Sequence, residues 1–374
     1  MDIQSATQSY ESWLARFCAL NQDDLAYKHE QLANPASAFP FFRGTYYRWL
    51  QHWPVVCPHL QDTPRILAVG DLHVENFGSW RDSDGRLVWG VNDFDEAAEA
   101  PYVNDLVRLT ASVRFARQAG VFDLKIPRAA AAVLKGYRDN LAAGGLPFVL
   151  EERHPELRAM AMAVERDPVR FWKKMTRLLA NPEASPPEDV CAALRDDMLI
   201  PGVTCAFRFR PKVGMGSLGK PRFVALADCQ GGWVAREAKV VTPPASTWVR
   251  YAEKNENLDK PGSRMAECVA NAVRCPDPFY RPGPRWIIRR LAPRCSRIEL
   301  TQLGSVKDQL LLLESMGAEI ANIHLGTPHA ARTILADLDH RPAGWLETAA
   351  RDMAKALEAD WTEWKGTTGK NARP

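Results

Sequence analysis

The secondary-structure patterns of this chain change twice along its length, and their order restricts the fold more than any other feature. Residues 1–200 carry mainly helical patterns, residues 201–296 carry mainly strand patterns, and residues 297–374 return to helical patterns. We therefore predict an α+β fold with two lobes. A small antiparallel sheet lobe lies between two chain segments that together form a larger helical lobe.

Composition and charge exclude several classes of protein. The chain has 374 residues, a net charge of +3 and no block of basic residues, so nothing in it indicates a nucleic-acid partner. No apolar run approaches the roughly 18 residues of a membrane span, and the N-terminus lacks a secretion signal. The eight cysteines form no C-x-x-C pair, which argues against zinc. We expect a cytoplasmic protein with reduced thiols, and its oligomeric state stays open.

A polar loop follows a short apolar strand pattern near residues 66–69. In this loop, G-D-L-H-V-E-N, Asp71 and Asn76 are five residues apart, and Asp93 follows a second strand pattern. Phosphoryl transfer needs one carboxylate that orients the attacking hydroxyl and accepts its proton. It also needs an amide and a second carboxylate that hold Mg²⁺ against the phosphates. We predict Asp71 as the catalytic base, Asn76 and Asp93 as magnesium ligands, and Asp95 as an auxiliary acid.

The spacing of these residues is typical of kinases. D-x-x-x-x-N matches the kinase catalytic loop, and Asp93-Phe94 takes the place of the metal-binding Asp-Phe. The alternative is that Asp71 and Asn76 only form an Asx-turn that caps backbone amides. The downstream Asp93 favours the catalytic interpretation. His73, in the same loop, is expected to have a structural role.

A glycine-rich segment, V-G-M-G-S-L-G at residues 213–219, lies between two predicted strands. In a Rossmann fingerprint the third glycine opens a helix, so the context argues against that motif. The strand context favours the glycine-rich loop of kinases, whose backbone amides cover the nucleotide phosphates. The residues predicted to bind the phosphates of ATP are Gly214, Gly216, Ser217 and Gly219.

A kinase site also needs a lysine on the third strand of the sheet, which holds the α- and β-phosphates. The third predicted strand offers Arg236 and Lys239. We prefer Lys239, because an ammonium acts as a point charge between phosphates whereas a guanidinium favours planar partners. Which of the two binds phosphate stays open.

A helix glutamate is expected to orient that lysine. Glu267 is the leading candidate, with Glu253 and Glu256 as competitors. The strand pattern over residues 285–292 is expected to face the adenine and to bind it through backbone groups of Arg289 to Leu291.

The order of these motifs is reversed relative to an ordinary kinase, in which the glycine loop and lysine precede the catalytic loop. The helical segment near residues 316–327 resembles the helix that usually leads into the catalytic loop, yet that loop lies near the N-terminus. A circular permutation explains both observations, because it preserves contacts while it changes connectivity.

Several of these segments carry resemblances to known families. Residues 70–73 and 93–95 are similar to the catalytic and metal-binding motifs of aminoglycoside phosphotransferase-like enzymes. More of the chain resembles an uncharacterised bacterial family, the domain-of-unknown-function family 2252, which is grouped with kinase-like proteins. This resemblance implies a kinase-like fold and no particular substrate. The segments that carry it are F-F-R-G-T (41–45), G-D-L-H-V-E-N-F-G (70–78), V-N-D-F-D-E-A (91–97), V-G-M-G-S-L-G (213–219), R-E-A-K (236–239), G-S-R-M-A-E (262–267) and I-A-N-I-H-L-G-T (320–327).

The resemblance is incomplete on the third strand. Relatives carry Lys-Glu-Ala there, and this chain has Arg236-Glu237-Ala238 followed by Lys239.

The predicted function is an ATP- and Mg²⁺-dependent phosphotransferase that acts on an unidentified, small-molecule hydroxyl acceptor. The alternatives are a kinase-like AMP transferase and a nucleotide-binding pseudokinase. A metallophosphoesterase is more remote, because two-metal sites need more His and Asp ligands than the eight scattered histidines offer. A non-enzymatic interaction module, built on the aromatic-rich N-terminal segment, is a further alternative.

Overall fold

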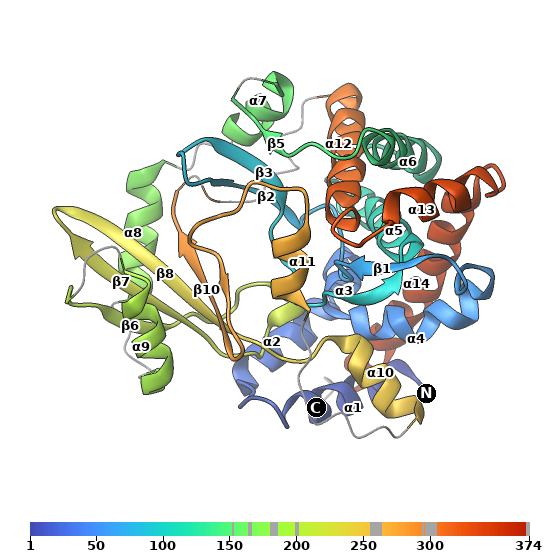
Figure 1. The fold of residues 1–374 in the computed structure, drawn as a ribbon. Helices are drawn as coiled ribbons and strands as arrows, with labels where there is room; N and C mark the ends of the chain where they lie inside the picture. Colours follow the sequence, from blue (N-terminus) through green and yellow to red (C-terminus); the bar gives the residue numbers. More distant parts are fainter. Residues whose placement is uncertain are drawn as a thin grey trace.

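The protein combines helices with antiparallel sheets, which is the α+β class that the sequence predicts (Figure 1). The computed structural model describes residues 1–151, 153–163, 167–179, 186–198, 202–254, 264–293, 295 and 305–371. The predicted boundaries at 200/201 and 296/297 lie outside these ranges. Within them, no helix has both the length and the apolar character needed to cross a bilayer.

Most helices gather on one side of the molecule, and the five-stranded sheet lies on the other (Figure 1). The N- and C-terminal segments both contribute to the helical side, where α1 packs against α14. The described helices are α1 (Ile3–Leu14), α2 (Gln22–Leu32), α3 (Phe39–Gly44), α4 (Tyr46–Val56), α5 (Val103–Gln118), α6 (Ile126–Ala142), α7 (Pro155–Ala163), α8 (Pro168–Leu179), α9 (Glu188–Asp196), α10 (Ala245–Lys254), α11 (Met265–Asn271), α12 (Val306–His324), α13 (Ala330–Asp339) and α14 (Trp345–Asn371), with 3-10 turns η1 (Pro58–Leu60) and η2 (Met215–Ser217).

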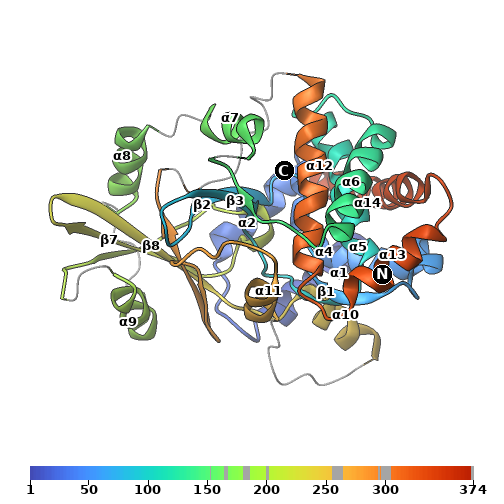
Figure 2. The ribbon, with the colours of Figure 1, turned by 45° about the horizontal axis from the view of Figure 1, so that its top comes forward.

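The five-stranded sheet is built from the middle of the chain in the order β6-β7-β8-β10-β9, with antiparallel neighbours. Figure 2 shows α8 and α9 on opposite faces of this sheet. Side chains alternate along each strand, so Phe223 and Ala225 pack with α9 whereas Val224 and Leu226 pack with Met175 of α8. The strands are β6 (Ala206–Phe209), β7 (Arg222–Cys229), β8 (Gly232–Val240), β9 (Arg281–Pro282) and β10 (Trp286–Leu291).

Two smaller sheets position the loops that the sequence singles out. One pairs β1 (Arg65–Ala68) with β4 (Ala98–Pro101), and the loop at residues 70–76 follows β1. The other contains the hairpin of β2 (Phe77–Arg81) and β3 (Leu87–Val91), which β5 (Phe148–Val149) extends. Its turn contains Gly85 at φ 76°, a conformation that favours glycine.

Helices α6 and α12 touch backbone to backbone at two glycines. A Cβ atom on Gly317 of α12 would overlap the carbonyl oxygen of Val133, and one on Gly136 of α6 would overlap that of Glu314. These helices carry residues that hold the loop at 70–76 from behind, so their close approach bears on the site.

Replacing Gly317 with alanine should destabilise the protein. The added methyl has no space between two backbones, and overpacking of this kind costs about 1–3 kcal/mol. Urea unfolding measures the change. Gly366→Ala is the matched control: that glycine lies in α14 with open space around its Cβ position, and the substitution should stabilise by roughly 0.5–1 kcal/mol. A Gly317→Ala variant as stable as the wild type would contradict the close approach.

Candidate functional site

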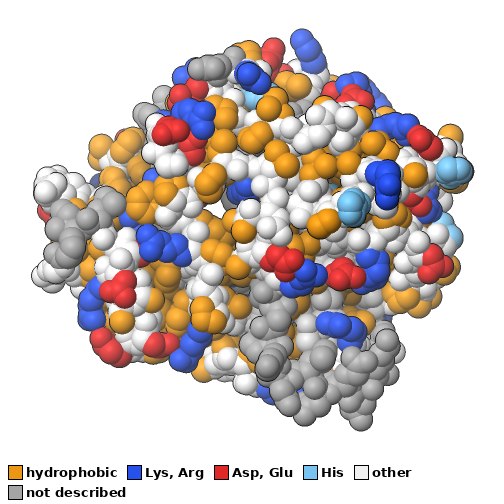
Figure 3. Space-filling model, in the orientation of Figure 1, with side chains coloured by type: hydrophobic (Ala, Val, Ile, Leu, Met, Phe, Trp, Pro, Cys, Tyr) orange, Lys and Arg blue, Asp and Glu red, His pale blue; other side chains and the backbone are white. Residues whose placement is uncertain are grey.

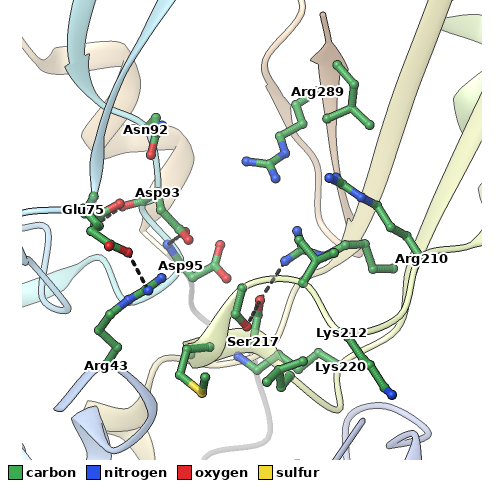
Figure 4. Close-up of a pocket in the computed structure, with 18 of the residues that line it drawn as sticks. Arg43, Glu75, Asn92, Asp93, Asp95, Arg210, Lys212, Ser217, Lys220 and Arg289 are labelled. Atoms are coloured by element: carbon green, nitrogen blue, oxygen red, sulfur yellow. Dashed lines mark hydrogen bonds and ion pairs between the residues drawn. The ribbon is translucent and has the colours of Figure 1, made fainter. Parts of the chain in front are cut away.

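A cavity of about 920 Å³ lies where three distant segments of the chain meet (Figure 4). These segments are the loop at residues 70–76, the residues that follow β3, and the glycine-rich turn at 213–219. The predicted site residues that line the cavity are Asp71, Asn76, Asp93, Asp95, Gly214, Gly216, Ser217, Arg289 and Leu291. Gly219, Lys239 and Glu267 are not among the residues that line it.

Asp71 is held by a fully buried arginine of α5. Its Oδ1 accepts hydrogen bonds from Nε (3.0 Å) and Nη2 (2.6 Å) of Arg108. The guanidinium also lies over the rings of Phe42, Tyr46 and Trp49, at 4.1, 4.8 and 4.9 Å from their centroids. Burial raises the pKa of the Asp71 carboxyl, and the charge of Arg108 opposes that rise. The arginine therefore fixes one oxygen of Asp71 and leaves Oδ2 for other partners.

The backbone before Asp71 is held by a second residue of α5. The carboxylate of Asp105 accepts the N–H groups of Val69 (2.8 Å) and Gly70 (3.0 Å). His324 of α12 contacts the same carboxylate through Nε2 (3.2 Å) and the hydroxyl of Tyr137 of α6 through Nδ1 (2.7 Å). All of these groups are buried. The network ties the loop to three helices.

Asn76 connects the loop to the residues after β3. Its side-chain Nδ2 donates to the carbonyl oxygens of Asp71 and Asp93, at 3.2 Å each. Because both hydrogen bonds use the nitrogen, Oδ1 is the atom that Asn76 offers to a cation. Asn76 itself is buried, so its orientation is fixed by these contacts.

Two other side chains of the loop have structural contacts. The Nδ1 of His73 accepts the backbone N–H of Glu75 at 3.2 Å, which agrees with the structural role expected for this histidine. The side chain of Glu75 pairs with Arg43 at 2.6 Å. Arg43 thus anchors α3 to the loop.

Lys239 lies behind the two acids that follow β3. Its Nζ is 3.4 Å from Oδ1 of Asp93 and forms an ion pair with Asp95. Desolvation opposes ionisation of Asp93, but Lys239, a hydrogen bond with Asp95, Arg289 and Arg222 together outweigh it. They hold the Asp93 pKa well below its ordinary value. Burial and the charge of Asp93 raise the pKa of Asp95. Lys239 is 5% exposed and pairs with a largely buried Asp95, whereas the side chain of Asp93 is 46% exposed.

The glycine-rich turn comes close to the loop at residues 70–76. Gly214 has φ 75°, which favours glycine. A Cβ atom on Gly216 would lie 3.4 Å from Oδ2 of Asp71 and 3.2 Å from the carbonyl oxygen of Arg43. A larger residue at position 216 would therefore fill the gap between the turn and Asp71.

The end of the turn is anchored outside the cavity. The carbonyl oxygen of Gly219 accepts the N–H of Asn21 at 2.9 Å, and a Cβ atom on this glycine would press on Leu25 of α2. Ser217 accepts a hydrogen bond from Nη2 of Arg222 at 2.7 Å. Gly219 thus has an anchoring position, whereas Gly214, Gly216 and Ser217 face the cavity.

Glu267 does not pair with Lys239. It is about 45% exposed on α11, and its Oε2 accepts from Nε of Arg264 at 2.8 Å. The reason lies in the helix face: Met265 and Cys268 are the buried residues of α11, so Glu267 points outward. The partners of Lys239 are the acids of the loop after β3.

Strand alternation places Arg236 and Lys239 on opposite faces of β8. Arg236 points to the opposite face of β8, where its Nε donates to Asp197 at 2.7 Å, so Lys239 is the residue on the cavity side. The competing Glu256 and the side chain of Glu253 lie outside the described residues.

Lys220 is a cavity residue that the sequence analysis does not single out. It directly follows Gly219, it is only 5% exposed, and it lines the cavity. Burial raises the pKa of the nearby Glu96 to about 7, and the ammonium of Lys220 opposes that rise. Glu96 also accepts the N–H of Ala245 at 2.6 Å. The sequence signal for Lys220 is its position directly after Gly219, the third glycine of the motif.

Glu319 of α12 supports the hairpin that delivers Asp93. Its Oε1 accepts the N–H of Val91 at 3.2 Å, and its Oε2 accepts from Nδ2 of Asn322 at 3.1 Å. Burial raises the pKa of this carboxyl from 4.5 to about 7, and Arg274 opposes the rise.

The raised pKa of Glu319 predicts a pH-dependent stability. The folded state binds the proton more tightly than the unfolded chain, so this contribution is complete below pH 4.5 and is lost as the pH rises through 7. Glu319→Gln removes the titration. Between pH 5 and 8 the wild type should lose about 2.5 kcal/mol of unfolding free energy relative to the variant, as measured by urea unfolding.

The readout is the slope of the unfolding free energy against pH, not its absolute value. The glutamine amide would face Nδ2 of Asn322 and so lower the stability of the variant at every pH. Parallel pH profiles for wild type and variant would show that Glu319 titrates normally.

One family model matches the part of the chain that carries the acidic residues of the site. Residues 20–178 match the model of a family described as an uncharacterized protein conserved in bacteria (DUF2252). This stretch contains the loop at 70–76 and Asp93, and it ends before the glycine-rich turn and β8. No curated protein and no solved structure matches the chain.

Proposed function

We propose that this protein is an ATP- and Mg²⁺-dependent phosphotransferase with a kinase-like site, and that it acts on a hydroxyl of a small-molecule acceptor. One observation carries the proposal. Asp71, Asn76 and Asp93 share a single cavity with the glycine-rich turn at 213–219, although the turn lies more than a hundred residues further along the chain. That combination of groups is what phosphoryl transfer requires.

Asp71 is the proposed base. Arg108 holds its Oδ1, so Oδ2 is the atom that can receive the proton of the acceptor hydroxyl. Burial raises the pKa of the carboxyl, which makes Asp71 a stronger base than an exposed aspartate. Arg108 acts as a positioning residue, since it touches Asp71 and is itself fully buried.

The donor atoms near Asp93 suit Mg²⁺. Asn76 and Asp93, with Asp95 beside them, offer only oxygen, the ligand type that Mg²⁺ prefers. In the part of the chain that the structure describes, no three His, Cys, Asp or Glu side chains form a metal cage. Mg²⁺ is usually held by one or two carboxylates and completed by water and phosphate oxygens. When bound, it would offset the negative charge of the phosphates.

The phosphates are proposed to lie under the glycine-rich turn. Gly214 and Gly216 face the cavity there, and Lys220 presents a buried ammonium from the end of the same turn. Lys239 lies on β8, the strand next to β7, and pairs with Asp93 and Asp95. Two ammonium groups at this depth would neutralise part of the charge of a bound triphosphate.

A permuted kinase-like fold agrees with where the chain ends lie. Gln4 of α1 hydrogen bonds with Thr367 of α14, so the first and last described helices touch. Joining such ends and opening the chain elsewhere would preserve every contact. Helix α12, which resembles the helix leading into a kinase catalytic loop, contacts that loop's anchor through His324 and Asp105.

Two substitutions should affect different steps: Asp93→Asn should remove nucleotide binding, and Asp71→Asn should remove turnover alone. ATP with Mg²⁺ at about 100 times its Kd should stabilise the protein by roughly 2.7 kcal/mol in a thermal-shift assay. Asp93→Asn should abolish this stabilisation, because it removes a metal ligand. Asp71→Asn should keep it and lower turnover by about 10²–10⁴-fold, since only the base is lost.

Mass spectrometry of a metabolite extract incubated with ATP and the protein measures turnover and identifies the transferred group. An adenylyl product would replace the proposal with AMP transfer. Nucleotide binding without any product would favour a pseudokinase, and the absence of a shift at millimolar ATP would refute the site.

Lys220 is expected to contribute directly to nucleotide affinity. A charge-assisted contact to phosphate is worth about 1.5–3 kcal/mol, so Lys220→Met should weaken ATP binding at least tenfold in a calorimetric titration. Lys355→Met is the matched control, because the Lys355 side chain is 62% exposed, pairs with Asp352 at 3.6 Å and does not line the cavity. An equal or larger loss of affinity at Lys355 would contradict this assignment.

A further inference from the structure

Three arginines surround a single carboxylate in the sheet wall of the cavity. Glu237 of β8 is fully buried and forms ion pairs with Arg210, Arg222 of β7 and Arg289 of β10. The Arg222 contact is 3.3 Å and the Arg289 contact is 2.5 Å. All three arginines line the cavity, whereas Glu237 lies behind them. We call these four residues the arginine cluster.

The arginine cluster carries more positive charge than its own acid can balance. Desolvation opposes ionisation of Glu237, but Arg222, Arg289 and Arg210 together outweigh it and hold the Glu237 pKa well below its ordinary value. The cluster therefore contains three cations and one anion. Among the described residues, the Nε of Arg210 is buried without a hydrogen-bond partner. Asp93 offsets part of the charge of Arg289, and Asp95 part of that of Arg222. The positive charge that remains favours an anion in the cavity.

The cluster lies beside the proposed phosphotransfer site. Glu237 and Lys239 are two residues apart on the same face of β8, a separation of about 7 Å along a strand. The charge of Arg289 also contributes to the low pKa of Asp93, so the two groups are within electrostatic reach. In Figure 4, Arg210 and Arg289 extend from the sheet into the cavity, opposite Asp93 and Asp95.

The wall near the cluster adds two cations and one acid, Asp167, which pairs with Arg170 at 3.7 Å. Helix α8 contributes Arg170 and Lys174 to the cavity lining, and its Met175 packs on Val224 and Leu226 of the sheet face that carries the cluster. The acids of the cavity lie mainly on the opposite side, in the loop at 70–76 and after β3. A ligand in this part of the cavity therefore meets cations from both the sheet and α8.

We propose that the arginine cluster is an anion subsite that binds a phosphate group of the ligand without Mg²⁺. Guanidinium groups match phosphate oxygens in paired hydrogen bonds, and three of them converge here. The inference rests on the proposed phosphotransfer function for its role. The phosphate comes either from the donor nucleotide or from an acceptor that already carries a phosphate.

The test uses pyrophosphate as the probe, with EDTA present so that no metal contributes. The wild-type protein should bind pyrophosphate in a calorimetric titration. Arg289→Gln should weaken this binding by about 10- to 100-fold, because one charge-assisted contact is lost while Glu237 keeps two arginine partners. Arg285→Gln is the matched control: Arg285 is 68% exposed, pairs with Asp189 and does not line the cavity, so binding should be unchanged.

Arg210→Gln provides a second variant in case Arg289→Gln misfolds, as judged by circular dichroism. The subsite is refuted if the wild type binds no pyrophosphate in EDTA. It is also refuted if the folded variants at Arg289 and Arg210 bind it as tightly as the wild type.

Asp93→Asn separates the subsite from the proposed function. This variant should retain pyrophosphate binding in EDTA at full strength, because it removes a nearby negative charge and no arginine. Pyrophosphate binding without any ATP–Mg²⁺ binding would therefore support the subsite and refute phosphotransfer. Displacement of pyrophosphate by AMP would assign the subsite to the donor, and simultaneous binding of both would assign it to a phosphorylated acceptor.

Discussion

The site depends on the hydrogen bonds that the buried carboxylate of Asp105 accepts from the backbone before Asp71. A charge at full burial is tolerated only when it is hydrogen bonded, and here the backbone N–H groups of Val69 and Gly70 and the ring of His324 meet that need. The same contacts fix the main chain immediately before Asp71. One turn further along α5, Arg108 fixes the Asp71 side chain. A single helix thus sets both the backbone and the side chain of the proposed base.

The cavity has walls of opposite charge, and each wall comes from a different part of the fold. The acids follow strands of the two small sheets on the helical side, and the arginines come mainly from the five-stranded sheet. On the face seen in Figure 3, basic and acidic side chains are interleaved without a block of either sign. The separation of charge inside the cavity differs from the pattern on that face.

Local patterns predict the elements of this fold better than they predict its side-chain partners. The β2–β3 hairpin and the strands on both sides of the glycine-rich turn follow from turn residues and alternation, which are read within a few residues. The short strands β4 and β9 give no such pattern, and their pairing depends on distant partners. Helix α10, which follows two prolines, is also not predicted.

In the site, too, local motifs are predictable and distant side-chain partners are not. The spacing of Asp71, Asn76 and Asp93 matches a known motif and so predicts a shared site, and all three line one cavity. Glu267 was expected to pair with Lys239, but the buried face of α11 turns it outward. Arg108 gives no local signal, since its partner lies 37 residues earlier in the chain. Ion pairs between distant segments depend on how those segments pack, which periodicity does not contain.

Lys239 offsets negative charge on the acidic side of the cavity. Its ammonium neutralises Asp93 and Asp95 across the boundary between the sheet and the helical side. A phosphate with its cation would exchange these partners, because the cation takes the carboxylates while the phosphate takes the ammonium. The arginine cluster has no such internal exchange, since Glu237 balances only one of its three cations. The unbalanced charge of this wall makes an anionic ligand the natural complement of the cavity.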